Sequence, residues 1–379
     1  MRTWNAVSFG ALDMREWDGP FAHVDFIVLP IYPLAEPLGL VGPPAVLWQR
    51  LLEGQVSEEH LSSEELELIL DFEHVGIATS SGKHSNHIVD VCTPWLSSPL
   101  HELVYALVQS IASDAKIDVI FVKGPILRSQ GLRTRFHSGD VDVWVRPSQL
   151  ECLVKLMEPW GWKVQPGIWQ GTKVNHSTTL SPDRWGCELD IHEHFPGVAL
   201  DSEEAFDRFA TSLTKHEFAS VDVEVPSMEC HAIIQSLHVL RPNFGTTGTS
   251  DRVLVARDTL MTAGAETIRL ARELGASAVL HEPLSMAFPE HEFSQPEALP
   301  DNWVWRGKKN RVFAYCYALR MVPLRMRPLI LFRFIFPSRA ILLESERIAG
   351  GSASNWFSLW CKRLARGVKP LFSNFKTIK

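Results

Sequence analysis

The sequence predicts an α+β fold in which a small N-terminal domain precedes a core of strands and helices and a mostly helical C-terminal region. Three observations support this class. An apolar run of strand length, Val119–Val122, ends at a glycine turn and is followed by an alternating polar and apolar segment, Gly139–Val145. A second alternating segment covers 187–194. Helical periodicity dominates from Asp201 onward, apart from a strand-like Val221–Val225.

Length and composition restrict the classes of function. The chain has 379 residues, 45% apolar and 21% charged, enough for two or three globular domains. Its net charge of −7 argues against nucleic acid as the main partner. Six scattered cysteines without a Cys-x-x-Cys pair indicate reduced thiols in a cytoplasmic protein. The N-terminus lacks the apolar core of a signal peptide, and 329–343 is too short and too charged to span a bilayer, so no membrane partner is expected.

Residues 1–80 are expected to form the N-terminal domain. His23–Pro30 has the composition of a strand, and Pro43–Gly54 that of a helix with proline in its first turn and glycine after its end. Two shorter helical segments follow between Ser57 and Gly76. They contain several acidic residues and no Lys or Arg, which argues against DNA binding.

This order resembles the small winged-helix domains of the PqqD-like family. The resemblance rests on Leu47–Gly54, which contains the pattern W-x-x-L-x-x-G, and on Phe72–Ile77. It implies a peptide-chaperone module, and so a peptide or protein acceptor that residues 1–80 recruit by adding a strand to a sheet edge. The alternative is a winged-helix domain that only packs or dimerises.

Residues 81–100 are expected to be a linker and 101–200 the core. Alternation places Asp140 and Asp142 on one face of their strand, with Cα atoms about 6–7 Å apart. Two such carboxylates repel each other unless a cation lies between them, and oxygen ligands favour Mg²⁺ or Mn²⁺. An isolated D-x-D is more often a solvated strand face. The turn at Lys123-Gly124 favours the metal site, because it offers an ammonium group and backbone N–H groups to a phosphate.

A strand ending in Lys-Gly, a short helix, an arginine and D-x-D together resemble the DNA polymerase beta-type nucleotidyltransferases, in particular a branch of uncharacterised nucleotidyltransferases. The matching residues are Lys123, Gly124, Arg135, Asp140, Asp142 and Val145. The resemblance implies a polymerase-beta-type mixed-sheet core, an NTP substrate and Mg²⁺ or Mn²⁺. Two positions depart from the pattern. Pro125, which has no N–H, stands where the wider superfamily usually has serine. Arg135 lies one residue further from Asp140 than expected, so Arg133 competes for its role.

The segment 187–194 is the expected source of a third carboxylate. Glu188, Asp190, His192 and His194 share one face by period 2. Leu189–His192 resembles a strand of the same nucleotidyltransferase branch, which implies Asp190 and leaves Glu188 as the runner-up. Residues 201–379 are expected to form a helical domain, and its basic tail from Lys362 is interpreted as solvated.

The resemblance implies a Mg²⁺-dependent nucleotidyltransferase that transfers a nucleoside monophosphate from an NTP to an unknown acceptor. The expected catalytic residues and metal ligands are Asp140, Asp142 and Asp190, and the expected triphosphate contacts are Lys123, Gly124 and Arg135. Asp190 would also help to remove the acceptor's proton. One alternative is a catalytically silent peptide-binding chaperone or scaffold. Another is a toxin-like nucleotidyltransferase acting on RNA or protein, which the net negative charge disfavours.

Overall fold

The computed structural model describes residues 2–33, 36–80, 86–135, 139–244, 250–295, 298–348 and 355–373, except the side chains of Glu344, Arg347, Ile348 and 366–373. Part of the expected linker, 81–85, and the end of the basic tail, 374–379, lie outside these ranges. Contacts divide the chain into two compact units. Unit 1 comprises Met1–Lys163, Thr179–His194 and Asp201–His231, and unit 2 comprises Val164–Thr178, Phe195–Leu200 and Ala232–Lys379.

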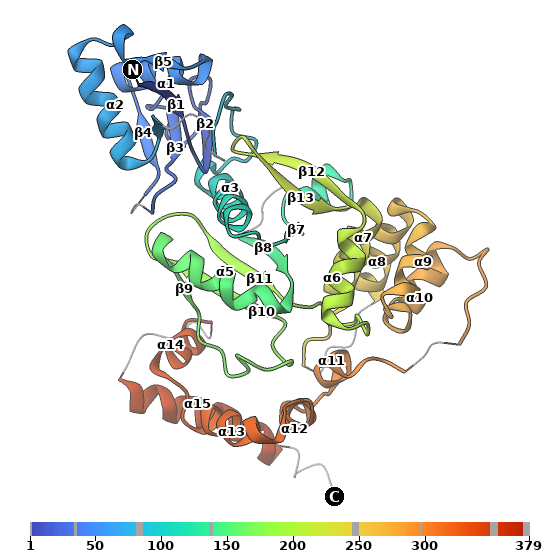
Figure 1. Cartoon of the computed structure of the whole chain (residues 1–379). Helices are drawn as coiled ribbons and strands as arrows, with labels where there is room; N and C mark the ends of the chain where they lie inside the picture. The colour runs from blue at the N-terminus through green and yellow to red at the C-terminus, as the bar shows by residue number, and fades with distance from the viewer. Residues whose placement is uncertain are drawn as a thin grey trace, which may run out of the picture. The chain divides into compact units, whose positions relative to one another are not determined.

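The N-terminal part of unit 1 contains two antiparallel three-stranded sheets, β5-β1-β6 and β2-β3-β4 (Figure 1). Its helix α2 begins with a capping box, in which Ser62 and Glu65 satisfy each other's backbone N–H groups. Trp4 and Trp48 lie at the centre of its apolar core. The elements are β1 (Thr3–Ala6), β2 (Gly10–Asp13), β3 (Phe26–Leu29), β4 (Leu38–Leu40), α1 (Pro43–Glu53), β5 (Val56–Ser57), a 3₁₀ turn (Glu58–His60), α2 (Ser63–Val75) and β6 (Ala78–Thr79).

Strand β2 joins this part to the rest of unit 1. A Cβ atom added to Gly10 would lie 2.6 Å from the Cβ atom of Ala106, so the glycine permits close approach to the next helix. The N–H of Ala11 donates to the carbonyl of Ala219 at 2.9 Å, and Leu12 forms an isolated bridge with Cys92. The β2 edge of its sheet is therefore covered. The winged-helix interpretation stays a prediction.

The core of unit 1 is a five-stranded sheet with the order β7-β8-β11-β10-β9. Strand β7 runs antiparallel to β8, and β11 runs parallel to β8, so the sheet is mixed. Helix α3, which is apolar on nearly every side, is buried as expected for a helix covered all round. The elements are α3 (Pro99–Asp114), β7 (Val119–Val122), α4 (Ile126–Ser129), β8 (Asp140–Val145), α5 (Leu150–Met157), β9 (Trp162–Val164), β10 (Ser177–Pro182) and β11 (Glu188–His192), with 3₁₀ turns at Pro147–Gln149 and Glu158–Trp160.

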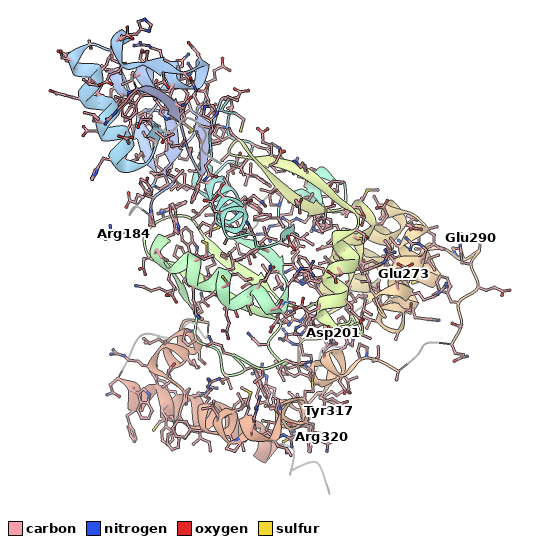
Figure 2. All side chains as sticks on the ribbon, viewed as in Figure 1. Arg184, Asp201, Glu273, Glu290, Tyr317 and Arg320 are labelled. Atoms are coloured by element: carbon pink, nitrogen blue, oxygen red, sulfur yellow. The ribbon has the colours of Figure 1, made fainter. Side chains whose placement is uncertain are left out.

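Unit 1 ends with helix α6 (Ser202–Ala210), the hairpin of β12 (Leu213–Phe218) and β13 (Val221–Pro226), and the first residues of α7 (Met228–Leu240). Asp201 caps α6, because its carboxylate accepts the N–H of Glu203 at 3.0 Å; Figure 2 labels Asp201 at this helix start. The rings of Phe218 and Tyr105 stack at 4.1 Å, so the hairpin is held against α3.

Unit 2 is helical apart from short segments. Its elements after α7 are α8 (Ser250–Ala263), α9 (Glu266–Glu273), α10 (Ser277–Ala287), α11 (Asp301–Val304), α12 (Arg311–Met321), α13 (Arg327–Ile335), α14 (Arg339–Ile348) and α15 (Trp356–Ser373), with 3₁₀ turns at Trp305–Gly307 and Leu324–Met326. A small apolar core around Trp305, Ala314 and Ile330 joins α12 and α13. Among the described residues, every helix is too short or too polar to cross a membrane. The predicted α+β class, with a mixed-sheet core and a helical C-terminal region, is confirmed.

Candidate active site

The pairing of two central strands brings two aspartates together. Strands β8 and β11 are parallel neighbours, and their register places Asp190 directly beside Asp142. Period-2 alternation points both side chains to the same face. One ligand atom each from Asp142, Asp190 and His192 lies within 4.8 Å of the others. We call these three residues the acidic cluster.

The ammonium group of Lys123 lies on the acidic cluster. Its Nζ atom donates to Oδ1 of Asp142 at 2.5 Å and lies 3.1 Å from Nε2 of His192. The same Nε2 atom is 2.7 Å from Oδ1 of Asp142. The Asp142 and Lys123 side chains are only 5% and 12% exposed, so this ion pair is shielded from water and from salt.

The two carboxyl groups have opposite pKa shifts. Burial opposes ionisation of Asp142, but the positive charge of Lys123 and the hydrogen bond from His192 outweigh it and hold the pKa of Asp142 well below its usual range. Burial raises the pKa of Asp190, against the hydrogen bond that Asp190 accepts from Thr179, and the negative charge of Asp142 raises it further. The charge of Lys123 therefore favours ionisation of Asp142 more strongly than that of Asp190, whose pKa is raised mainly by burial.

This donor set suits a divalent cation. Carboxylate oxygens are the ligands preferred by Mg²⁺ and Mn²⁺, and an imidazole nitrogen favours Mn²⁺ over Mg²⁺. A second positive charge at the cluster would offset the repulsion that raises the pKa of Asp190. Asp142 and Asp190 would hold such an ion, and His192 either joins them or orients Asp142.

The turn after β7 has an unusual backbone. Lys123 and Gly124 both have positive φ angles, 59° and 55°. This conformation is costly for a residue with a Cβ atom, so the position of Lys123 needs support from its surroundings. Helix α4, which follows, is a single turn. With Pro125 preceding it, the turn offers fewer N–H groups to a phosphate than the sequence pattern suggests.

A chain of hydrogen bonds from His231 and Gln130, which are buried and half-buried, supports this turn. The N–H of Lys123 donates to Nε2 of His231, at the start of α7. Nδ1 of His231 lies 2.7 Å from Oε1 of Gln130, whose amide nitrogen donates to the carbonyl of Pro226 at 2.9 Å. Because Nε2 accepts, the proton of the neutral ring is on Nδ1 and donates to Gln130. Complete burial, reinforced by the nearby charge of Lys123, lowers the pKa of His231 to about 3, so the ring is neutral at physiological pH.

Asp140 and Glu188 pair with each other two residues before Asp142 and Asp190 on strands β8 and β11. Asp140 is the first residue of β8 and is half-buried, while Glu188, its partner in the register, is exposed. Asp190, and not Glu188, is the carboxylate that β11 places beside Asp142. The three-residue cluster does not include Asp140, whose role as a metal ligand stays a prediction.

The two candidate arginines differ in burial. Arg135 is exposed, and its carbonyl accepts the Nε–H of Arg133 at 2.9 Å. Arg133 is half-buried; burial and the charge of Arg135 lower its pKa, while the negative charges of Asp142 and Asp140 counteract them. Of the two, Arg133 is the partly buried one, and the negative charges of Asp142 and Asp140 favour its charged form.

Sequence reasoning missed three residues of the site: His192, His231 and Gln130. Period-2 alternation places His192 on the same face as Asp190, so the sequence could have indicated His192 as a member of the site. His231 and Gln130 lie in helical or loop segments with no metal-binding or catalytic motif. Only the packing of α7 against the β7 turn brings them to Lys123.

Comparisons with known proteins give only distant similarity. No family model and no curated protein matches the chain. The solution structure of the antibiotic-resistance factor ANT(2'')-Ia matches 51% of this chain and 97% of its own, at 12% identity and a TM-score of 0.31. The lincomycin-bound lincosamide antibiotic adenylyltransferase LnuA matches 43% of this chain and 96% of its own, at 14% identity and a TM-score of 0.28. An antigenic nucleotidyltransferase-like protein from Paracoccidioides brasiliensis matches 50% of this chain and 97% of its own, at 14% identity and a TM-score of 0.30. At these values the functional argument rests on the site itself.

Proposed function

We propose that the chain is a divalent-metal-dependent nucleotidyltransferase, which transfers a nucleoside monophosphate from an NTP to an acceptor. One observation carries the proposal: two carboxylates, Asp142 and Asp190, lie side by side on parallel central strands and share a buried site with a lysine from the adjacent glycine turn. A structural ion pair needs only one carboxylate for Lys123. The second carboxylate, whose pKa is raised by burial and by the charge of Asp142, is a further ligand that a cation could use.

The residues take separate roles in this proposal. Asp142 and Asp190 hold Mg²⁺ or Mn²⁺, with Asp140 as the further ligand that the sequence pattern implies. When bound, such an ion would neutralise charge on the triphosphate and would polarise the acceptor oxygen. Lys123, displaced from Asp142 by the ion, has a flexible stem long enough to pair with the triphosphate instead. Gly124 lets the backbone approach the phosphates, and Arg135 and Arg133 neutralise them.

The bond changes are those of nucleotidyl transfer. The acceptor oxygen bonds to the α-phosphorus, the bond between the α-phosphorus and the bridging oxygen to the β-phosphate breaks, and pyrophosphate leaves. Asp190, which the sequence pattern implies as the base, receives the acceptor's proton. The proton then passes to solvent. Positioning and charge neutralisation supply most of the catalysis in such reactions.

For the acceptor, we propose a peptide or protein recruited by residues 1–80. Strand β4 is at the edge of the β2-β3-β4 sheet, and the opposite edge, β2, is covered. Among the described strands, β4 is therefore the edge of this sheet that remains for an added strand. Val41→Asp places a charge next to this edge, at a side chain that is 47% exposed, and should weaken binding of the acceptor with little effect on NTP binding. Unchanged acceptor affinity would contradict recruitment at β4.

Transfer is tested with each NTP labelled at its α-phosphate, incubated with the purified chain, Mg²⁺ or Mn²⁺, and an extract of its own cells. The parent is expected to label a specific acceptor only when the metal is present. Asp142→Asn should reduce the rate at least about 100-fold, because it removes the charge that holds the ion. Asp118→Asn is the matched control: its side chain is 64% exposed and pairs with Arg146 at the surface.

Equal labelling by the parent and by Asp142→Asn would refute the proposed active site. If the parent transfers no label and calorimetry detects no binding of metal-NTP, the chain is not a nucleotidyltransferase. The peptide-binding scaffold is then the interpretation to pursue, through the β4 edge.

A further inference from the structure

The last fifth of the chain has a charge opposite to that of the rest. Residues 305–379 contain sixteen lysines and arginines against two glutamates, whereas the whole chain has a net charge of −7. The residues before 305 are therefore strongly acidic. Such asymmetry within one chain indicates a partner with negative charge for the basic part.

Unit 2 also presents apolar side chains to solvent on helix α13. Phe332 is 58% exposed, and Leu331 and Ile335 are also exposed, while Ile330 is fully buried in the core of the unit. Positions 331, 332 and 335 fall on one side of a helix. This side continues into Phe336, which is also exposed and lies 5.3 Å from Phe332 between ring centroids.

The first turns of α15 extend this apolar side. The rings of Trp356 and Phe357 each lie 6.0 Å from Trp360, which stacks on Phe336 at 6.3 Å. The indole N–H of Trp360 donates to the carbonyl of Ile335 at 2.6 Å, which ties α15 to α13. We call the exposed residues of this patch the aromatic face; they are Leu331, Phe332, Ile335, Phe336, Trp356 and Phe357.

Cationic side chains surround the aromatic face in the sequence and lie exposed in the structure. Arg325 precedes α13, Arg339 begins α14 and Lys362 follows Trp360 by two residues. Helix α12 adds Arg311 and Arg320, and Figure 2 labels Arg320 and Tyr317 on this helix. An apolar aromatic surface bordered by Lys and Arg is typical of helices that lie in the headgroup layer of a membrane.

We propose that helices α12–α15 bind the surface of a membrane containing anionic lipids, with the aromatic face inserted between the headgroups. Each Lys or Arg near such a surface contributes about 1 kcal/mol of attraction. A second copy of the chain is a poorer occupant, because two aromatic faces would bring two basic regions together. Nucleic acid would match the charges, but it would leave the aliphatic Leu331 and Ile335 without an apolar partner.

This surface differs from the expectation of no membrane partner. Every described helix is too short or too polar to cross a bilayer, so the inferred contact is peripheral. The inference is independent of the proposed chemistry, since it rests only on residues of unit 2.

The experiment is flotation of the full-length chain with phosphatidylcholine vesicles, with and without phosphatidylserine. The parent is expected to float with phosphatidylserine vesicles and to be released by salt, because the Debye length shortens. Phe332→Glu/Phe357→Glu should weaken binding on the order of 100-fold, through loss of apolar burial. Arg325→Glu/Arg339→Glu should weaken binding only to the anionic vesicles. Val46→Glu is the matched control, because Val46 is equally exposed at 60% but lies on α1 in unit 1.

Three results would overturn the inference. The first is equal binding of the parent to vesicles with and without phosphatidylserine. The second is unchanged flotation of Phe332→Glu/Phe357→Glu, provided that thermal unfolding shows the variant to be as stable as the parent. The third is that the parent does not bind vesicles but self-associates or binds single-stranded RNA, and that Phe332→Glu/Phe357→Glu abolishes this association. The aromatic face would then bind a second copy of the chain or nucleic acid.

Discussion

Replacing Lys123 by methionine tests whether its ammonium group occupies the position that a metal ion takes. Lys123 and Asp142 form a buried pair, and removal of one partner of such a pair typically costs about 3–5 kcal/mol of unfolding free energy. Methionine retains most of the apolar stem, so the loss comes from the charge rather than from packing. We therefore expect Lys123→Met to be clearly less stable than the parent when no divalent metal is present.

The metal dependence should move in the opposite direction. In the parent, an entering ion must break the charge-assisted hydrogen bond that Lys123 donates to Asp142. Such a bond contributes ~1.5–3 kcal/mol. Without that competitor, the acidic cluster should bind Mn²⁺ about 10- to 150-fold more tightly in the absence of NTP. Turnover with NTP should nevertheless fall, because the triphosphate loses a cation. One substitution thus separates metal affinity from catalysis.

The assay is calorimetric titration with Mn²⁺ without nucleotide, combined with thermal unfolding at several Mn²⁺ concentrations. The ion should raise the unfolding temperature of Lys123→Met more than that of the parent, since tighter binding to the folded state stabilises it more. Lys163→Met is the control: the Lys163–Asp183 pair is at the surface, so its loss should cost at most ~0.5 kcal/mol and leave Mn²⁺ binding unchanged. Equal Mn²⁺ affinity of parent and Lys123→Met would refute the reasoning.

Three further predictions follow from the same structure. The pKa of His231 is about 3 in the folded chain and 6.5 in its ordinary range, so the unfolded chain takes up the proton first as the pH falls. The free energy of unfolding should therefore fall by about 1.4 kcal/mol per pH unit below pH 6.5. Urea unfolding at pH 7 and pH 5 should show a smaller fall for His231→Gln than for the parent. Glu102→Ala should cost about 3 kcal/mol or more in denaturant unfolding, because the Glu102 carboxylate accepts the N–H groups of Trp95, Leu96 and Ala219, and a cost within experimental error would exclude this role. Arg133→Met should weaken NTP binding about tenfold, and more than Arg135→Met does, because Arg133 is partly buried near the carboxylates. If calorimetric titration with NTP gave the reverse order, Arg135 would be the main contact.

Several elements were predictable because their signals are local. The apolar run and its glycine turn predicted β7 with its observed bounds, and alternation predicted β8 and its two faces. Alternation also placed Asp190 and His192 on one face of β11, whatever strand lies next to it. Proline at the start and glycine after the end marked α1 within one residue.

The arrangement around these elements was not predictable, because it depends on contacts between distant parts of the chain. Alternation fixes the face of Asp142 and of Asp190, but the parallel register of β8 and β11 decides that they are neighbours. The sequence pattern assigned Lys123 to a phosphate, whereas the structure places its ammonium on Asp142. His231 supports the Lys123 turn from a helix more than a hundred residues away in the sequence.

The basic C-terminal region shows the same division. Charge and aromatic content are visible in the sequence, which leads only to the interpretation of the basic tail from Lys362 as solvated. Only the tertiary structure shows that Ile330 is used for the core of unit 2 while Phe332 and Ile335 remain in water. By itself, then, the sequence determined strands β7, β8 and β11, the faces of the carboxylates on β8 and β11, and the candidate chemistry. The tertiary structure decided which charges meet and which apolar residues stay exposed, because a period of two or of 3.6 residues specifies a face but not the partner packed against it.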